Sequence, residues 1–156
     1  MDKIKVTILG SGGSFGVPAL SNRWGNCDPK NFKNLRTRPG AIIEKNGKTI
    51  LIDANPDLRQ QLITNKITTI DSVLFTHAHA DHTHGINDLR AINLANRLKM
   101  PVYADKSTMK SLLNAFEYIF KSKNMAQYPP ICEIIEYEAG KTYQIDGFKI
   151  EVIKQN

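Results

Sequence analysis

Hydrophobic and polar residues alternate at the start of the chain. In residues 3–9 the apolar side chains Ile4, Val6 and Ile8 occupy every second position, which is the period of a β-strand with one apolar face. A glycine-rich stretch, residues 10–16, follows at once. It lacks the third glycine of a dinucleotide-binding loop, so we expect these glycines to let the backbone pass close beneath a site.

The pattern then changes from a loop to a hairpin. Residues 19–39 show no periodicity and contain Asn, Asp, Pro and Gly, which predicts a long loop of the kind that is often functional in a compact domain. Residues 41–44 and 49–52 are short apolar runs, and the Asn-Gly pair between them is a strong hairpin signal. We therefore expect two antiparallel strands, the second of which ends at Asp53.

Three later segments have the apolar spacing of helices. The first begins at residues 55–57, where a capping amide, a proline and an acid come together. The second covers residues 86–98, and the third is capped by Ser107. The apolar or inward positions expected along these helices are Leu58, Leu62, Ile63, Ile86, Leu89, Ile92 or Asn93, Leu94, Met109, Leu112, Leu113, Phe116, Ile119 and Phe120.

Further strands are predicted between and after these helices, at residues 72–76, 101–104 and 131–137. Residues 141–145 and 148–153 predict a last hairpin that turns at an Asp-Gly pair. This alternation of strands and helices, flanked by two hairpins, favours a layered α/β fold. We expect all 156 residues to form a single domain with a core of its own.

Charge is unevenly distributed along the chain. The net charge is +6, and one run of sixteen residues holds five cations and a single acid: Arg23, Lys30, Lys33, Arg36, Arg38 and Asp28. Such a loop suits a phosphate-bearing ligand, and an ordinary solvated loop is the alternative. The charges do not alternate with aromatic residues, which gives a single-stranded nucleic-acid surface little support.

Composition also bears on compartment and cofactors. No apolar run approaches the roughly 20 residues that cross a bilayer, and the N-terminal residues have strand spacing, not that of a signal peptide. We therefore expect a soluble, cytoplasmic protein with no membrane partner. Cys27 and Cys132 lie far apart without CxxC spacing, so we expect neither a disulfide framework nor a cysteine zinc site.

All four histidines lie in one short stretch between the predicted strand at residues 72–76 and the predicted helix at residues 86–98, and the first three form the pattern HxHxDH. His77 and His79, two residues apart, can reach one metal ion together. Asp81 and His82, one short turn later, can reach a second ion a few ångströms away. The alternative is a polar loop that is rich in histidine by chance, and the complete pattern after a strand argues against it.

This pattern resembles the metallo-β-lactamase superfamily, whose hallmark is HxHxDH. Residues 8–18, 51–53, 56–59 and 82–90 further resemble its phosphodiesterase branch, which includes the cyclic phosphodiesterase of phosphonate metabolism and is related to the nucleases that process tRNA 3′ ends. The resemblance implies an αββα sandwich. We expect this chain to form roughly its first half to two thirds and to be incomplete at the C-terminus.

The resemblance also implies a function and the residues that perform it. It implies a zinc-dependent hydrolase, most directly a phosphodiesterase for a small cyclic or nucleotide-like phosphodiester, with two zinc ions or with manganese. The implied roles are metal ligation by His77, His79, Asp81 and His82, orientation of the attacking hydroxide by Asp81, support of the histidine loop by Asp53, substrate contact or proton donation by His84, and phosphate contact by Arg59 and Arg90. For His84 the alternative is a capping role, and for Arg59 and Arg90 it is a solvated position on a helix.

The family's site needs more ligands than HxHxDH supplies. A third histidine, a bridging aspartate and a final histidine complete it, and this chain has no histidine after His84. We therefore expect little activity from the chain alone. Two alternatives remain open: hydrolysis of another ester or a thioester on the same scaffold, and an inactive remnant that serves as an assembly module. The expected partners are a small phosphodiester and either a second copy of the chain or a complementing C-terminal segment.

Overall fold

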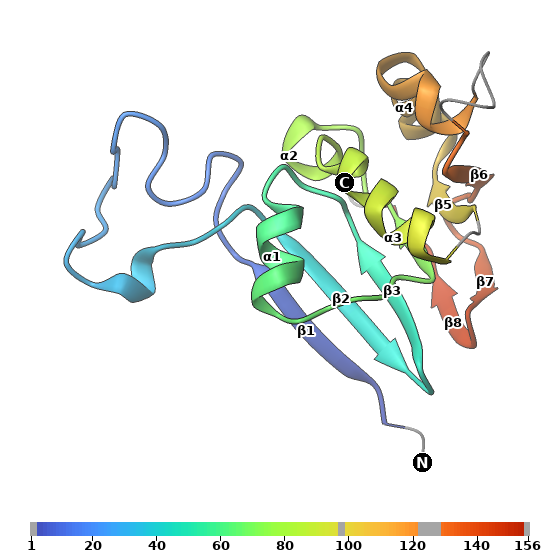
Figure 1. The fold of residues 1–156 in the computed structure, drawn as a ribbon, viewed down its shortest axis with the longest axis horizontal. Helices are drawn as coiled ribbons and strands as arrows, with labels where there is room; N and C mark the ends of the chain where they lie inside the picture. Colours follow the sequence, from blue (N-terminus) through green and yellow to red (C-terminus); the bar gives the residue numbers. More distant parts are fainter. Residues whose placement is uncertain (1–2, 97–98, 122–128, 155–156) are drawn as a thin grey trace.

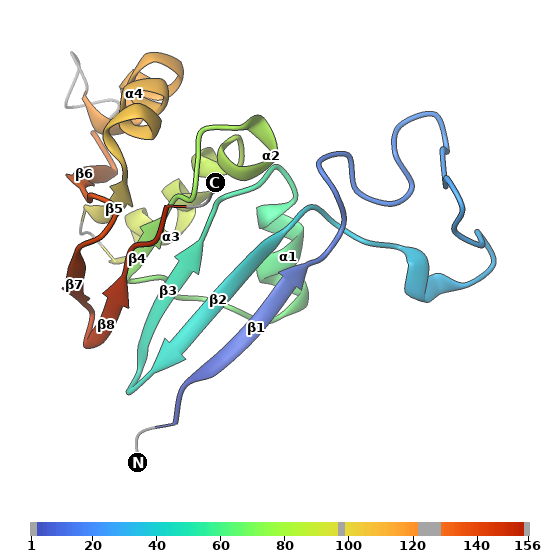
Figure 2. The same cartoon turned by 180° about the vertical axis from the view of Figure 1, so that it is seen from behind.

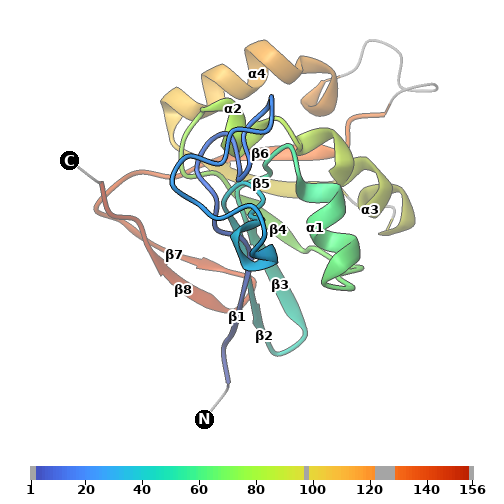
Figure 3. The same ribbon diagram turned by 90° about the vertical axis from the view of Figure 1, so that its left-hand side faces the viewer.

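The computed structural model describes residues 3–96, 99–121 and 129–154. A six-stranded sheet carries the helices on one face and a separate two-stranded hairpin on the other (Figures 1 and 3). In chain order the elements are β1 (Lys5–Gly10), a 3-10 turn (Phe32–Asn34), β2 (Gly40–Lys45), β3 (Lys48–Ile52), α1 (Leu58–Thr64), β4 (Ser72–Leu74), α2 (Ala80–Thr83), a second 3-10 turn (Ile86–Asp88), α3 (Leu89–Asn96), β5 (Met100–Ala104), α4 (Lys106–Phe120), β6 (Cys132–Glu136), β7 (Thr142–Ile145) and β8 (Phe148–Glu151).

The sheet order places the loops that follow its parallel strands at one edge. The strands run in the order β1 to β6; β1, β2 and β3 pair antiparallel, and β3 to β6 pair parallel. The connections between the parallel strands carry α1, α3 and α4 over the same face. The carboxyl ends of β3, β4 and β5 therefore meet at one end of the sheet, which is where ligands bind in open α/β sheets.

Both predicted hairpins are present. The central residues of the β2–β3 turn, Asn46 and Gly47, have φ of 51° and 76°, and those of the β7–β8 turn, Asp146 and Gly147, have φ of 50° and 80°. Two positive φ values in a two-residue loop suit the right-handed twist of the paired strands. The Asn-Gly and Asp-Gly pairs therefore fix the registers that the alternation predicted.

The core lies mainly between the sheet and the helices, and most predicted inward positions are buried there. Ile63 and Leu94 are exceptions, with exposed fractions of 55% and 56%. The prediction for Leu94 is wrong. It treats residues 86–98 as one helix with 3.6 residues per turn, but Ile86 belongs to a separate 3-10 turn with three residues per turn. The direction in which the residues of α3 point is therefore shifted relative to that prediction. Asn93 faces inward and donates to the carbonyl of Ile131 at 3.0 Å. The predicted helix end at residue 98 lies outside the described residues.

Two predicted helix starts are also corrected. Asp105, not Ser107, caps α4, because its carboxylate accepts from the backbone amides of Ser107 and Thr108 at 2.7 and 2.9 Å. At α1 the cap position is Asp57, whose side chain makes no capping bond to the helix. Asn55 lies two residues before Asp57. Its side-chain oxygen accepts from the backbone amide of Asp57 and so forms a turn that leads into the helix.

One apolar strip of the sheet is uncovered on the hairpin face. Ile4, Val6 and Ile8 have exposed fractions of 58%, 58% and 64%. Val6 pairs with the partly buried Ile43 of β2, and the β7–β8 hairpin covers the neighbouring strands but leaves this edge open (Figure 2). We call Ile4, Val6 and Ile8 the β1 strip. Exposed apolar side chains on an edge strand favour association with another chain.

We expect the chain to self-associate through the β1 strip. Sedimentation over a concentration series should show the monomer giving way to dimers or larger species. The double substitution Val6→Thr and Ile8→Thr keeps two residues that favour strands and removes two apolar contacts, so it should shift the distribution toward monomer. Its free energy of unfolding should change by less than about 1 kcal/mol, because both positions are exposed. A wild-type chain that stays monomeric at every concentration would contradict this prediction.

Candidate functional site

The histidines lie at the carboxyl end of β4, where the parallel strands end (Figure 3). His77 and His79 occupy the loop after the strand, and His79 is the residue that precedes α2. Asp81 and His82 lie in α2, a single turn that the apolar pattern did not predict. The turn brings the second half of the HxHxDH motif back toward the first.

Backbone hydrogen bonds fix this turn against the loop that follows β3. The amide of Ala54 donates to the carbonyl of His82, and the amide of Gly85 donates to the carbonyl of Ala54, both at 2.8 Å. A Cβ atom added at Gly85 would overlap the carbonyl oxygen of Asn55, so only glycine fits at this close approach. The position of His82 therefore depends on the loop after β3.

Asp53, in that loop, contacts the histidine segment directly. It is 4% exposed and has a φ of 60°, a conformation that non-glycine residues adopt mainly where the surrounding structure requires it. Its carboxylate accepts from the amide and the hydroxyl of Thr76 at 2.7 and 2.8 Å, and it lies 2.7 Å from Nδ1 of His82. Because a carboxylate only accepts, Nδ1 of His82 carries a proton, which leaves Nε2 as the nitrogen of this ring that is available to a metal ion.

The four predicted metal ligands lie together in the pairs that their spacing suggests. Nε2 of His77 is 3.1 Å from Nδ1 of His79, and Nε2 of His82 is 3.5 Å from a carboxylate oxygen of Asp81. The rings of His77 and His82 are 4.1 Å apart between centroids, so the two pairs adjoin. Burial, and next the neighbouring His82 and His79, lower the pKa of His77 below its ordinary value. The neutral imidazole that a metal ligand requires is therefore favoured.

The donor set fits zinc in kind but forms only part of a coordination shell. Two nitrogens bound to one tetrahedral zinc at about 2.0 to 2.1 Å lie about 3.3 Å apart, close to the 3.1 Å between His77 and His79. Among the described residues, however, no group of three or more His, Cys, Asp or Glu side chains is arranged to hold a metal ion. The side chains thus match an open site that needs further ligands.

Asp81 is held in its charged form. Burial raises the pKa of its carboxyl, but hydrogen bonds from the Ser14 side chain and from a backbone amide, with the nearby His82 and His77, outweigh burial and leave the pKa lowered. Ser14 belongs to the glycine-rich loop after β1. That loop therefore reaches the site through Ser14. Its glycines do not pass beneath the site as expected: a Cβ atom at Gly10 or Gly12 would meet the backbone carbonyls of residues 36–38.

Comparison with known proteins assigns the family. Residues 48–156 match the family described as the Beta-lactamase superfamily domain. The chain belongs to the metallo-β-lactamase superfamily. Its fold superposes on a diphosphatase from the PhnP family with a TM-score of 0.80 and 29% identity, over 94% of this chain and 55% of that one. It also superposes on Zn²⁺-bound PqqB from Methylobacterium extorquens with a TM-score of 0.72 and 21% identity, over 97% of this chain and 56% of that one.

Curated relatives extend the comparison. The chain is 34% identical over 152 residues to an octanoyltransferase of Porphyromonas gingivalis, which covers 97% of this chain and 30% of that protein. It is 30% identical over 126 residues to a ribonuclease Z of Thermococcus kodakarensis, which covers 74% of this chain and 38% of that protein. The chain therefore spans between 30% and 56% of the length of these four proteins. The predicted superfamily, its phosphodiesterase and tRNase Z-like branch and the layered fold are confirmed.

A cavity adjoins the metallo-β-lactamase motif in this chain. It has a volume of about 710 Å³, and its lining includes Asp53, His77, His82, Tyr137 and Lys154. A cavity of this size accommodates a small organic molecule. Residues from the sheet edge and from the segment after the hairpin thus line one cavity with His77 and His82.

Three of the predicted site residues lie elsewhere. His84 is exposed, bonds the hydroxyl of Thr83 through Nδ1 at 3.1 Å, and packs edge-on against Phe116 of α4 at 5.2 Å between ring centroids. Arg59 and Arg90 line a different groove, of about 550 Å³, between α1 and α3. The structure therefore brings Asp53, His77, His79, Asp81 and His82 together, and it does not bring His84, Arg59 or Arg90 into the cavity.

Sequence reasoning missed three residues of the site. Thr76 bonds both Asp53 and, at 3.0 Å, Nδ1 of His77, and its place directly before the motif was the available signal. Ser14 and Tyr137 come from distant parts of the chain, and no local pattern connects them with the histidines. Tyr137 is buried, and its hydroxyl donates to the carbonyl of Phe75 at 2.6 Å.

We expect Tyr137 to make the protein sensitive to alkali. Burial raises the pKa of this tyrosine from 10 to about 12, so folding favours the neutral phenol. That stability is fully present below pH 10 and is lost as the pH rises from 10 to 12. The slope of unfolding free energy against pH over this interval should be smaller in Tyr137→Phe, which should also lose about 1 kcal/mol near neutral pH with the hydrogen bond. Unchanged slopes would contradict this prediction.

The buried thiol of Cys132 also makes the folded state less stable as the pH rises, because burial raises the pKa of this thiol from 9 to about 12. Cys132→Ala in the Tyr137→Phe background therefore separates the two groups: the remaining loss of stability between pH 9 and 12 should diminish further. Urea unfolding at a series of pH values measures both effects.

Proposed function

We propose that this chain carries part of the active site of a zinc-dependent phosphodiesterase. The observation that carries the proposal is the pairing of His77 with His79 and of Asp81 with His82 at the end of the sheet, with Asp53 fixing the ring of His82. The PhnP-family diphosphatase and the ribonuclease Z in the comparisons are named for reactions at phosphate esters or anhydrides. Those names support phosphorus as the centre that is attacked.

The chain's residues divide the work as follows. Zinc held by His77, His79, Asp81 and His82, or manganese in its place, would supply Lewis acidity toward a phosphoryl oxygen. Asp53 holds Nδ1 of His82, so Nε2 is the nitrogen that would bind the metal ion. Asp81, charged at neutral pH, would orient the attacking water, whose proton would pass to solvent. The remaining ligands of a closed site come from groups outside the described residues or from solvent.

The cavity favours a small phosphodiester, cyclic or nucleotide-like. Its volume of about 710 Å³ suits one such molecule, and its lining includes a cation, Lys154, beside the carboxylates of Asp53 and Asp105. The relative named octanoyltransferase does not by itself favour acyl transfer, because 70% of that protein lies outside the match. Ester or thioester hydrolysis remains the alternative that the assay below separates. His84, exposed beside the motif, is a weaker candidate for proton donation.

The test compares the turnover of two substrates by the chain alone and by the chain mixed with a complementing polypeptide. The purified chain is assayed with zinc or manganese on bis-p-nitrophenyl phosphate and on an acyl thioester, alone and with a polypeptide that corresponds to the part of the PhnP-family diphosphatase beyond the match. We expect little turnover from the chain alone and phosphodiester turnover from the mixture.

Matched aspartate variants separate the site from general charge effects. Asp81→Asn removes a metal ligand and the group that orients the water, so it should lower the turnover of the mixture by about a hundredfold or more. Asp28→Asn makes the same chemical change on an exposed loop and should leave it intact. Turnover of the thioester but not the phosphodiester would favour the alternative, and robust turnover by the chain alone would show that the site is already complete.

A further inference from the structure

The long loop between β1 and β2, residues 11–39, extends far from the sheet (Figure 1). We call it the basic arm, because it holds five cations and one acid and so carries a net charge of +4 out of the chain's +6. Neither the histidine site nor the proposed hydrolysis uses its outer part. Its charge is high enough to attract a polyanion at ordinary ionic strength.

The arm has a defined backbone that presents these charges. Val17 and Arg36 exchange two backbone hydrogen bonds, of 2.8 and 2.9 Å, across its base. Arg38 is held there by an ion pair with Asp57 at 2.9 Å. Farther out, Asn31 caps the 3-10 turn through the amide of Lys33. The outer cations thus lie on a turn that is closed by hydrogen bonds.

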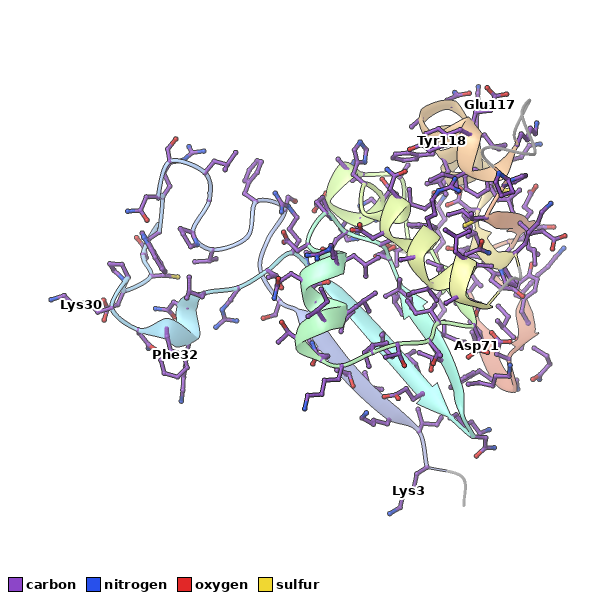
Figure 4. The ribbon with its side chains drawn as sticks, viewed as in Figure 1. Lys3, Lys30, Phe32, Asp71, Glu117 and Tyr118 are labelled. Atoms are coloured by element: carbon purple, nitrogen blue, oxygen red, sulfur yellow. The ribbon has the colours of Figure 1, made fainter. Side chains whose placement is uncertain are left out.

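Exposed aromatic rings lie among the outer cations. Phe32 is 75% exposed and directly precedes Lys33, and Phe32 and Lys30 project from the far end of the arm (Figure 4). Phe15, at the base, is 73% exposed, and Trp24, which follows Arg23, is half-buried. In the sequence, charges that do not alternate with aromatic residues lend a single-stranded nucleic-acid surface little support, but at the far end of the arm Phe32 is exposed together with Lys30 and Lys33.

We propose that the basic arm binds single-stranded nucleic acid, with Lys30 and Lys33 at phosphates and Phe32 stacked on a base. Exposed rings that stack on bases, beside cations that follow the backbone, are how proteins hold single strands without reading sequence. The exposed Leu20 and Leu35 would equally suit a protein partner, but five cations against one acid favour a polyanion. This binding is independent of the proposed hydrolysis and needs no metal.

Fluorescence anisotropy with labelled RNA and DNA oligonucleotides of about 12 nucleotides tests the proposal, in chelator so that hydrolysis is excluded. We expect saturable binding that weakens as salt is raised. Lys30→Gln with Lys33→Gln should weaken it about tenfold and reduce the slope of log affinity against log salt by about 1.4, which corresponds to two lost phosphate contacts on a single strand. Phe32→Ala should weaken it about fivefold or more.

Two controls make the result decisive. Lys106→Gln with Lys110→Gln makes the same charge change on the exposed side of α4 and should have little effect. Equal losses in the two double variants, or equal affinity for inorganic polyphosphate with no effect of Phe32→Ala, would show attraction by net charge alone and overturn the proposal. Absence of binding at low salt would also overturn the proposal. If Leu20→Ser then abolished self-association in sedimentation, the arm would be a contact between copies of the chain.

Discussion

Gly85→Ala is expected to lower the free energy of unfolding by about 3 kcal/mol or more and to displace the second half of the HxHxDH motif. The added methyl group would overlap the carbonyl oxygen of Asn55, which is backbone and cannot rotate away. Overpacking in a rigid contact costs about 1 to 3 kcal/mol. Separation of the two segments would also weaken the 2.8 Å bond from Gly85 to Ala54. Urea unfolding, with the midpoint and slope analysed separately, measures the loss.

Gly13→Ala is the matched control. Gly13 lies in the loop after β1, and no atom lies within 4 Å of where its Cβ would be. The substitution should change the unfolding free energy by less than about 0.5 kcal/mol, as at other exposed positions, or raise it slightly by restricting the unfolded chain. Equal losses in the two variants would mean that the site does not depend on the contact between Gly85 and Asn55.

Features encoded within a few residues were predictable. The Asn-Gly and Asp-Gly turns specify both hairpins, because few other residues adopt two successive positive φ values. His77 and His79 adjoin because they are two positions apart at the end of a strand, and one helical turn brings Asp81 and His82 back to them. Spacing alone therefore predicted that these four side chains lie together.

Features that depend on distant partners were not predictable in the same way. Asp53 could be connected with the histidines only through the family resemblance, since 29 residues separate it from His82. Tyr137 and Ser14 reach the site through the sheet and the loop after β1, and nothing near them in the sequence indicates it. Arg59 and Arg90 seemed suited to phosphate by residue type, but α1 and α3 direct them to another groove.

The helical phase failed for a local reason that pattern analysis does not detect. In a continuous helix from Ile86, Leu94 would lie at the edge of the inward face, but the first turn is 3-10 and rotates Leu94 farther toward solvent. Asn93, expected as the alternative to Ile92, does face inward, and its amide donates to a carbonyl 38 residues away. A buried asparagine with such a partner cannot be distinguished in sequence from a solvated one.

Zinc affinity is where the incomplete ligand set should have its largest effect. A complete structural zinc site contributes about 10 to 16 kcal/mol. A site with half of the protein ligands should retain about 5 to 8 kcal/mol, which corresponds to dissociation constants from millimolar to micromolar. His79→Ala removes one of the two nitrogens that lie 3.1 Å apart, so zinc binding by this variant should fall below detection in calorimetry.

His84→Ala is the control for this experiment, since it removes the one histidine that packs against Phe116 outside the cavity. Its zinc affinity should match the wild type. Binding should weaken as the pH falls and the imidazoles gain protons, and the lowered pKa of His77, caused first by burial, keeps that ligand neutral to a lower pH than an ordinary histidine. Equal losses in His79→Ala and His84→Ala would refute the pairing of His77 with His79. Stoichiometric zinc that survives dialysis against a chelator would instead require ligands beyond the four, because two pairs of side chains that form only part of a coordination shell do not hold the ion that tightly.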